Sequence, residues 1–293
     1  MTKKVLLTGG RGFIAQSLLK DLQQDCEVHC YGRQQLDLLD TESVEKLIKK
    51  QNYDVVIHSA TYDAAPAFSN KNPLMVLQNN LAMYFNIARC SEYFGKMLYF
   101  GSGAEFGREN WIPRMREDYF DVFVPTDQYG LSKYTMTKYT EKSDNIYNLR
   151  LFGVTGELDD WRYRFISLAC CKAMFSMSIT FRQNVFFDFL YIQDLVDIVK
   201  WFMINKPKHK VYNVCTGTSI DYQTISEMIC DISSKNLEIR PQNDGLGIEY
   251  SGDNNLLLEE IEYDFTLPED YVGKIYGWFR ENRHKIDKTK FQY

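Results

Sequence analysis

Short apolar runs alternate with longer amphipathic segments along the first half of the chain. The apolar runs have the length and residue types of buried strands, and they lie at residues 5–8, 27–31, 54–60, 96–102 and 146–152. Most of the segments between them are long enough to contain helices. Helices are predicted at residues 41–50, 73–93 and 129–142, the second ending before Gly95. This pattern predicts an α/β fold with a doubly wound parallel sheet.

The regular alternation weakens after residue 152. Residues 155–161 are predicted to form a loop, residues 165–174 a helix, and residues 186–192 and 211–216 two further strands. The polar stretch 242–255 contains three glycines and is expected to be a flexible loop near a substrate. The second half is therefore expected to form a smaller, mixed region.

Composition and charge narrow the function classes. A chain of 293 residues with 45% hydrophobic residues can bury a substantial core. The net charge of −5 includes no basic stripe, which argues against nucleic acid and acidic membranes as partners. The N-terminus lacks a signal-peptide pattern and no apolar run is long enough to span a bilayer, so a cytoplasmic location is expected.

The cysteines predict neither disulfides nor a metal site. Seven are present without a Cys-x-x-Cys pair, so reduced thiols are expected. Cys26, His29 and Cys30 are close in sequence, but alternation along a strand sends the two cysteines to one face and the histidine to the other. No metal ligand set is therefore expected.

A glycine-rich turn follows the first predicted strand. Residues 8–15 are Thr-Gly-Gly-Arg-Gly-Phe-Ile-Ala, and Gly9 and Gly12 are the glycines that a phosphate-binding turn most needs. A helix that begins near Phe13 directs unpaired N–H groups and the positive end of its dipole at the turn. Ala15 replaces the third glycine of the dinucleotide fingerprint and still permits close packing. The residues expected around the dinucleotide phosphates are Gly9, Arg11, Gly12, Phe13 and Ile14.

A second group of residues has the spacing of an acid–base site. Tyr129 and Lys133 stand four residues apart and share one helix face, and Ser102 ends a preceding strand. A free tyrosine has a pKa of about 10, so it needs adjacent positive charge to pass a proton near neutral pH. Lys133 and an oxidised nicotinamide ring both supply that charge. Ser102 is placed to hydrogen-bond a substrate oxygen as charge develops on it, so these three residues are the predicted catalytic set.

These motifs resemble those of the extended short-chain dehydrogenase/reductase superfamily, in its branch of NAD(P)-dependent nucleotide-sugar epimerases, dehydratases and ketoreductases. The resemblance covers nearly the whole chain. It includes the glycine turn, the strand at 54–60, Asn80, the Ser102 strand and the Tyr-x-x-x-Lys pair. It extends to residues 188–194 and 212–217. The partner implied is a nucleotide-sugar substrate.

The resemblance also implies a domain organisation. A Rossmann-type domain at residues 1–153 would carry the catalytic site, and residues 154–293 would be mainly substrate-binding. Segments at about residues 180–216 would return to the first domain. Homodimers are usual in the family, through the helices predicted here at 73–93 and 129–142.

The resemblance assigns roles to individual residues. Tyr129 would be the general acid–base, Lys133 would lower its pKa and hold the nicotinamide ribose, and Ser102 would orient the substrate oxygen. Ala60 and Thr61 would line the cofactor cleft. The full set of further cofactor residues is Asp37, Leu38, Ser59, Ala60, Thr61, Asn80 and Phe152.

The end of the second strand favours NADP(H), with NAD(H) as the alternative. Members that prefer NAD commonly carry an acid there, which binds the ribose hydroxyls, whereas this chain has Gly32 and Arg33. Gly32 makes room for a 2′-phosphate, and Arg33 can form charge-assisted hydrogen bonds to it. Arg11 in the turn favours the same cofactor.

Three departures from the family pattern bear on the substrate. Phe187 stands where an arginine that binds the nucleotide diphosphate is frequent, and Gly153 replaces an asparagine after the fifth strand. Ala104 stands where members that epimerise at two carbons before reducing place a cysteine, which argues against double epimerisation. The predicted substrate-binding residues are Ser102, Gly103, Ala104, Arg182, Asp188 and Arg240.

Two enzyme functions and one non-catalytic function fit these features. The preferred one is NADPH-dependent reduction of a nucleotide-linked 4-keto-deoxysugar, with hydride from the nicotinamide and a proton from Tyr129. The alternative enzyme is an NAD-dependent 4-epimerase that removes and returns hydride at one carbon. A non-catalytic dinucleotide-sensing protein is the third, and the intact Ser102, Tyr129 and Lys133 argue against it.

Overall fold

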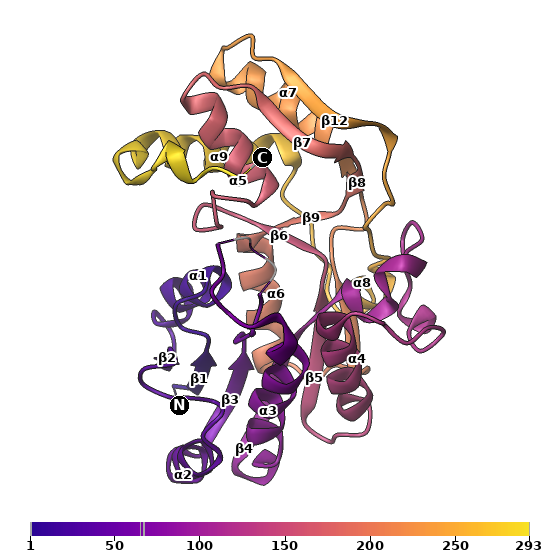
Figure 1. Cartoon of the computed structure of the whole chain (residues 1–293). Helices are drawn as coiled ribbons and strands as arrows, with labels where there is room; N and C mark the ends of the chain where they lie inside the picture. The colour runs from indigo at the N-terminus through magenta and orange to yellow at the C-terminus, as the bar shows by residue number, and fades with distance from the viewer. Residues whose placement is uncertain (1, 65, 67, 293) are drawn as a thin grey trace.

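The central element is a sheet of six parallel strands in the order β10-β5-β4-β3-β1-β2 (Figure 1). The computed structural model of the protein describes residues 2–64, 66 and 68–292. The strands of the sheet are β1 (Lys4–Thr8), β2 (Glu27–Tyr31), β3 (Tyr53–His58), β4 (Phe94–Ser102), β5 (Ile146–Leu151) and β10 (Val211–Val214). Their parallel direction brings all six carboxyl ends to one edge.

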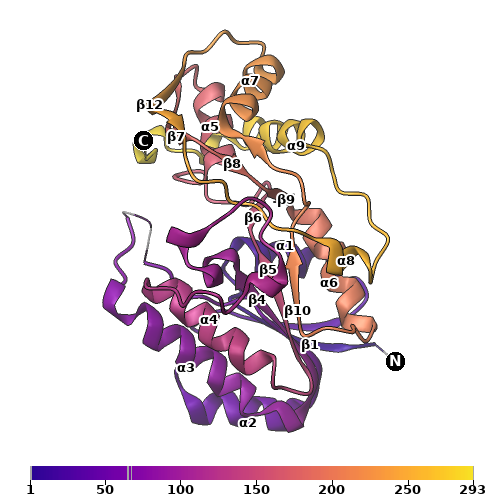
Figure 2. The ribbon, with the colours of Figure 1, turned by 90° about the vertical axis from the view of Figure 1, so that its right-hand side faces the viewer.

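Helices cover both faces of the sheet, because neighbouring strand residues point to opposite sides. Val5 and Leu7 join one buried cluster, while Leu6 joins another. Figure 2 shows α6 on one side of the sheet and the group of α2, α3 and α4 on the other. The covering helices are α1 (Phe13–Leu22) and α6 (Ile192–Ile204) on the first face, and α2 (Thr41–Gln51), α3 (Val76–Ala88) and α4 (Gln128–Thr140) on the second. The predicted doubly wound α/β class is therefore confirmed.

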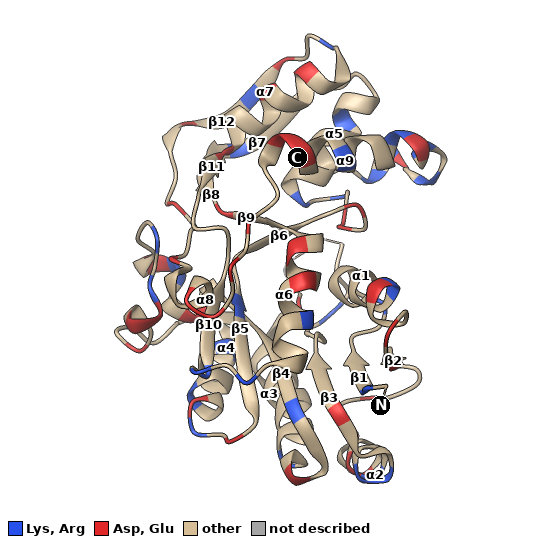
Figure 3. Cartoon of the chain, turned by 180° about the vertical axis from the view of Figure 1, so that it is seen from behind, with Lys and Arg blue, Asp and Glu red and all other residues tan. Residues whose placement is uncertain are grey.

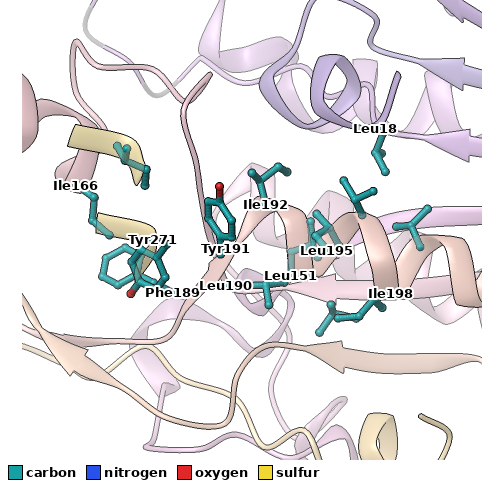
Figure 4. Close-up of a cluster of buried hydrophobic side chains, with 14 of the residues drawn as sticks. Leu18, Leu151, Ile166, Phe189, Leu190, Tyr191, Ile192, Leu195, Ile198 and Tyr271 are labelled. Carbon is teal, nitrogen blue, oxygen red and sulfur yellow. The ribbon is translucent and has the colours of Figure 1, made fainter. Parts of the chain in front are cut away.

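The C-terminal region lies beyond the carboxyl edge of the sheet, at the top of Figure 1. Its strands form three small pairs: β6 with β9, β7 with β12, and β8 with β11. One apolar cluster runs without a break from Leu18 and Ile198 beside the sheet to Phe189 and Tyr271 in this region (Figure 4). The elements are β6 (Gly153–Thr155), α5 (Phe165–Met174), β7 (Ile179–Asn184), β8 (Phe186–Phe187), β9 (Phe189–Tyr191), β11 (Ile220–Asp221), α7 (Tyr222–Ser233), β12 (Ile239–Leu246) and α9 (Pro268–Glu281). The short helix α8 (Asn255–Leu258) lies lower in Figure 1 and contacts β10 of the central sheet.

Several predicted elements need correction. The helix predicted at 73–93 is interrupted: α3 is flanked by 3₁₀ turns at Pro73–Met75 and Ser91–Tyr93, and Gly95 lies inside β4. The strand predicted at 186–192 breaks at Asp188, and α6 begins at Ile192. At the break, the Asp188 carboxylate accepts backbone hydrogen bonds from Thr216 and Gly217.

The polar stretch at 242–255 is only partly a loop. Residues up to Leu246 belong to β12, which pairs with β7 and so satisfies their backbone groups. The helix predicted at 165–174 is confirmed as α5, and the strand predicted at 27–31 is confirmed as β2.

Acidic and basic side chains are mixed along the surface elements seen from behind (Figure 3). Lys200 of α6 pairs with Asp21 of α1 at 3.0 Å, for example. Within the described part of the chain, no helix is both long enough and apolar enough to cross a membrane.

Candidate active site

The glycine turn joins β1 to α1 at the carboxyl edge of the sheet. Gly9 has φ +72°, and a Cβ there would lie 2.9 Å from the backbone of Ala60, so only glycine fits. Gly10 is also tightly packed, since its Cβ would lie 2.9 Å from the Cys30 sulfur and 3.0 Å from the backbone of Tyr31. Gly12 has an ordinary φ of −81°, and a Cβ there would meet only the Gly9 carbonyl oxygen, at 3.2 Å. Gly9 is thus the position that most clearly demands glycine, and Gly12 leaves the N-terminus of α1 open to a ligand.

Two adjoining cavities form one groove along this edge. The first, of about 440 Å³, lies beside the turn and the end of β2. The second, of about 250 Å³, lies over the ends of β4 and β5. Ser59 and Thr61 line both, so the groove is continuous. Predicted cofactor residues along the first cavity are Gly9, Arg11, Gly12, Arg33, Asp37, Leu38 and Ala60, and those along the second are Phe13, Ile14, Tyr129, Lys133 and Phe152.

The three predicted catalytic residues meet in the second cavity. Tyr129 and Lys133 extend from one face of α4, and Ser102 stands at the end of β4. The Lys133 ammonium lies 5.6 Å from the centre of the Tyr129 ring and donates a hydrogen bond to the Phe100 carbonyl at 2.8 Å. Burial lowers the pKa of Lys133 to about 8. Burial raises the pKa of Tyr129, and a hydrogen bond from Ser102 opposes that rise.

A buried carboxylate holds the serine and the helix together. Glu105 accepts hydrogen bonds from the Ser102 backbone N–H at 2.9 Å and from the Thr137 hydroxyl at 2.9 Å. Thr137 stands one turn beyond Lys133 on α4. Glu105 also pairs with Arg150 of β5 at 2.8 Å, and both side chains have 0% exposure. Because an unpaired buried charge is costly, Arg150 holds the Glu105 carboxylate in place. Through its hydrogen bonds, Glu105 in turn links Ser102 to Thr137 of α4.

Positive charge gathers around the first cavity. Arg11, Arg33 and Lys71 line it, and the Arg33 side chain is 72% exposed. Arg33 pairs with Asp37 at 3.2 Å, and Arg11 donates a hydrogen bond to Gln34. These surface contacts are weak, so both arginines can leave them and bind an anionic ligand.

Asn80 has a different position from the other predicted cofactor residues. Its amide oxygen accepts a hydrogen bond from the Tyr62 N–H at 2.7 Å, and its amide nitrogen donates to the Ser132 hydroxyl at 3.4 Å. Asn80 is 2% exposed and lines neither cavity. It therefore anchors the loop after β3 to α4.

The predicted substrate residues are dispersed. Gly103 and Ala104 are buried in a 3₁₀ turn behind Ser102. Asp188 is fully buried by its contacts with Thr216 and Gly217, so it lines neither cavity. The two remaining residues are exposed outside the groove on β7 and β12, namely Arg182 and Arg240.

Other charged residues line the second cavity instead. Arg164, at the N-terminus of α5, lies 3.9 Å from Asp159, in the preceding loop. Burial raises the pKa of Asp159 to about 6. Lys133 and Arg164 are the two cations that line this cavity in the described part of the chain. Asp159 lies in a predicted loop, and Arg164 directly precedes a predicted helix. Such positions often carry binding groups, and this was the signal that the sequence offered.

Aromatic rings also line this cavity. Phe165 and Tyr222 stack with ring centres 3.8 Å apart, and Phe187 stacks on Phe189 at 4.8 Å. A Cβ at Gly153 would collide with the Phe187 ring and lie 2.7 Å from the Asp188 carbonyl oxygen. The two departures from the family pattern, Gly153 and Phe187, therefore depend on each other, because a larger residue at 153 does not fit beside this phenylalanine.

Known proteins share this architecture. A GDP-6-deoxy-D-talose 4-dehydrogenase from Aggregatibacter actinomycetemcomitans is 24% identical over 299 residues, which covers 93% of this chain and 97% of that one. A GDP-mannoheptose C4 reductase from Campylobacter jejuni, solved with NADP bound, superposes with a TM-score of 0.83 at 18% identity, covering 95% of this chain and 98% of that chain. A UDP-glucose 4-epimerase from Thermotoga maritima, solved with UDP-glucose, has a TM-score of 0.80 at 18% identity, covering 96% and 99% of the two chains.

The family comparison covers most of the chain, including the glycine turn, Ser102, Tyr129 and Lys133. The model of the NAD-dependent epimerase/dehydratase family matches residues 5–215. The region matched runs from β1 to the end of β10, which is the whole central sheet. The chain therefore belongs to the NAD-dependent epimerase/dehydratase family.

Proposed function

We propose that the protein catalyses the NADPH-dependent reduction of a nucleotide-linked 4-keto-deoxysugar. The observation that carries this proposal is the meeting of Ser102, Tyr129 and Lys133 in a cavity that also reaches Phe13 at the start of α1. The names of a GDP-6-deoxy-D-talose 4-dehydrogenase and a GDP-mannoheptose C4 reductase among the similar proteins support chemistry at C4 of a nucleotide sugar.

The groove fits an extended dinucleotide. Gly9 and Gly12 leave the N-terminal N–H groups of α1 open for a pyrophosphate. Arg11 and Arg33 provide cations at the end of β2 for a 2′-phosphate. NADPH would supply a hydride when bound, and Lys133 would hold its ribose.

Three side chains carry the proton chemistry of the proposal. Tyr129 remains protonated at neutral pH and donates its proton to the sugar oxygen as the carbonyl carbon is reduced. Ser102 hydrogen-bonds the same oxygen, and the Lys133 charge stabilises the phenolate that remains. Arg164 supplies a second cation for the anionic part of the substrate.

A 4-epimerase is the second candidate, because the same three residues suffice and a UDP-glucose 4-epimerase has a similar fold. Cofactor retention separates the two. We expect the purified protein to be free of cofactor and, in fluorescence titrations, to bind NADPH more tightly than NADH. NAD that co-purifies and resists dialysis would favour the epimerase.

Replacing Arg33 by Ala is expected to raise the dissociation constant of NADPH by about tenfold or more, because a charge-assisted hydrogen bond contributes about 1.5–3 kcal/mol. NADH binding should change by less than about threefold, since NADH lacks the 2′-phosphate. Arg116→Ala is the matched control, because Arg116 is exposed and pairs with Asp118 outside the groove. Equal weakening of both cofactors by Arg33→Ala would remove the argument for NADP specificity.

The activity is expected to fall above about pH 8. Burial lowers the pKa of Lys133 to about 8, although the charges of Glu105 and Asp63 oppose this effect. The positive charge of Lys133 is therefore present below pH 8 and is lost above it. Tyr129 stays protonated throughout, because burial raises its pKa. The kcat/KM for NADPH should therefore decline by about tenfold per pH unit on this limb. In Lys133→Arg, whose side chain keeps its charge, the limb should disappear; an unchanged limb would assign it to another group.

A further inference from the structure

The Lys133 ammonium lies in the interior, where a charged group needs compensation. Lys133 is only 4% exposed, and its ammonium donates to the Phe100 carbonyl at 2.8 Å. We propose that Tyr99 is a positioning residue, whose ring face holds this ammonium beside Tyr129 and stabilises its positive charge. This inference rests on the proposed function, in which that charge stabilises the Tyr129 phenolate.

Two aromatic rings lie within cation–π distance of the ammonium. Its nitrogen lies 4.7 Å from the centre of the Tyr99 ring and 5.6 Å from that of the Tyr129 ring. Contacts below about 6 Å are attractive, because the face of the ring carries negative partial charge, and the attraction is larger away from water. The Tyr99 contact is the shorter one, and Tyr99 is completely buried. Tyr99 is therefore the ring that favours the charged form of Lys133 more strongly.

The backbone of β4 fixes Tyr99 relative to the site. Tyr99 pairs with His58 of β3 on one side and with Asn148 of β5 on the other, so it stands in the middle of the sheet. The next residue supplies the carbonyl that accepts the Lys133 hydrogen bond, and Ser102 ends the same strand. One strand thus sets the places of the ring, the carbonyl and the proposed catalytic serine.

Neighbouring rings hold the Tyr99 ring in this orientation. The His58 ring stacks on it at 6.1 Å, and the Tyr84 ring meets it edge-on at 5.1 Å. His58 is itself fixed, since its Nδ1 shares a hydrogen bond of 3.0 Å with the Thr8 hydroxyl. Among the residues that the structure describes, none is a hydrogen-bond partner of the Tyr99 hydroxyl. The site therefore uses the ring of Tyr99 and not its hydroxyl.

Charged groups on other elements act on Lys133 as well. Burial lowers the pKa of Lys133 to about 8, although Glu105, in the turn after β4, and Asp63, in the loop after β3, oppose this effect. Arg164, which lines the same cavity, is paired with Asp159. The pKa of Lys133 is thus close to neutral pH, so the loss of one favourable contact changes how much of the lysine is charged.

The two ring systems next to the ammonium on the sheet are neutral. Burial and the nearby Lys133 charge lower the pKa of His58 to about 3. Burial also raises the pKa of Tyr99 well above its usual value. The attraction between Tyr99 and Lys133 is therefore that of a cation for a neutral aromatic ring.

The test compares Tyr99→Phe, which keeps the ring, with Tyr99→Leu, which removes it. The pKa of Lys133 is measured by NMR titration of protein labelled with carbon-13 at the lysine Cε, and its signal is assigned by its absence from Lys133→Arg. We expect Tyr99→Leu to lower this pKa by about one pH unit or more, as the loss of a desolvated cation–π contact predicts. Tyr99→Phe should stay within about 0.3 pH unit of the parent. The alkaline limb of kcat/KM for NADPH should move with the pKa in each variant.

Two further variants separate the charge on the ring face from packing. Tyr147→Leu removes a buried ring from the opposite face of the sheet and should leave the pKa of Lys133 unchanged. Tyr99→pentafluorophenylalanine keeps a ring in place but reverses the sign of the charge on its face, so it should lower the pKa at least as much as Tyr99→Leu. It also takes the place of Tyr99→Leu if that variant does not fold.

The outcomes distinguish this inference from the proposed function. An unchanged pKa of Lys133 in Tyr99→Leu or in Tyr99→pentafluorophenylalanine would overturn the role of the Tyr99 ring, as would an equal fall in Tyr99→Phe. Full turnover by Tyr129→Phe would instead overturn the proposed mechanism. The NMR titration needs no substrate, so it decides the role of Tyr99 in either case.

Discussion

Replacing Tyr129 by Phe is expected to lower kcat by about 10²–10⁴-fold, the range that a positioned acid contributes to proton transfer. The ring remains and fills the same space, but the sugar oxygen no longer receives a proton as the hydride arrives. Binding of NADPH should stay within about twofold of the parent, because the residues proposed to bind the phosphates and the adenosine line the other cavity. The measurement is single-turnover oxidation of NADPH in the presence of a GDP-linked 4-keto-6-deoxyhexose.

Tyr134→Phe is the matched control for this experiment. Tyr134 lies on the same helix, one turn beyond Gly130, and its hydroxyl donates to Asp121 outside the cavity. It should retain nearly full turnover. Turnover by Tyr129→Phe at the parental rate would show that another group supplies the proton, and the assigned mechanism would have to be abandoned.

Replacing Arg150 by Met is expected to lower the free energy of unfolding by about 3–5 kcal/mol. The substitution leaves the Glu105 carboxylate in the interior without its counter-charge, although Thr137 and the Ser102 backbone still donate to it. The lost guanidinium also lies 4.5 Å from the centre of the Phe106 ring, so a favourable cation–π contact disappears.

Urea unfolding measures this effect directly. Arg116→Met is the control, because Arg116 and Asp118 form an exposed pair with 69% exposure on each side chain. Exposed pairs contribute about 0–1 kcal/mol, so the control should unfold close to the parent. If Arg150→Met unfolds at the same urea concentration as the parent, the buried pair does not carry the stability assigned to it.

The sequence was sufficient to predict the sheet and the place of the catalytic residues on it. Apolar runs with strand character indicate strands of a sheet that is buried on both faces. Because these strands are parallel, Ser102 and the glycine turn lie at the same edge of the sheet. The four-residue spacing of Tyr129 and Lys133 is likewise a local property of a helix. The roles of these residues stay predictions, as do the homodimer and the cytoplasmic location.

The substrate side could not be predicted in the same way. Arg164 reaches the second cavity from a segment that is joined to it only by tertiary contacts, so no periodicity marks it. Arg182 and Arg240 were candidates by charge alone, and their strand pairing places them on the exposed side of β7 and β12. The fit between Gly153 and Phe187 also appears only when β6 and β8 are placed side by side.

The transfer of deuterium from labelled cofactor tests the central claim most directly. NADPH in which both hydrogens at C4 of the nicotinamide ring are deuterium is incubated with the protein and a GDP-linked 4-keto-6-deoxyhexose, and the sugar is analysed by mass spectrometry and NMR. The proposed reduction predicts one deuterium at C4 of the product sugar for each NADPH oxidised. Recovery of the unreduced 4-keto sugar without deuterium, and without oxidation of NADPH, would contradict it.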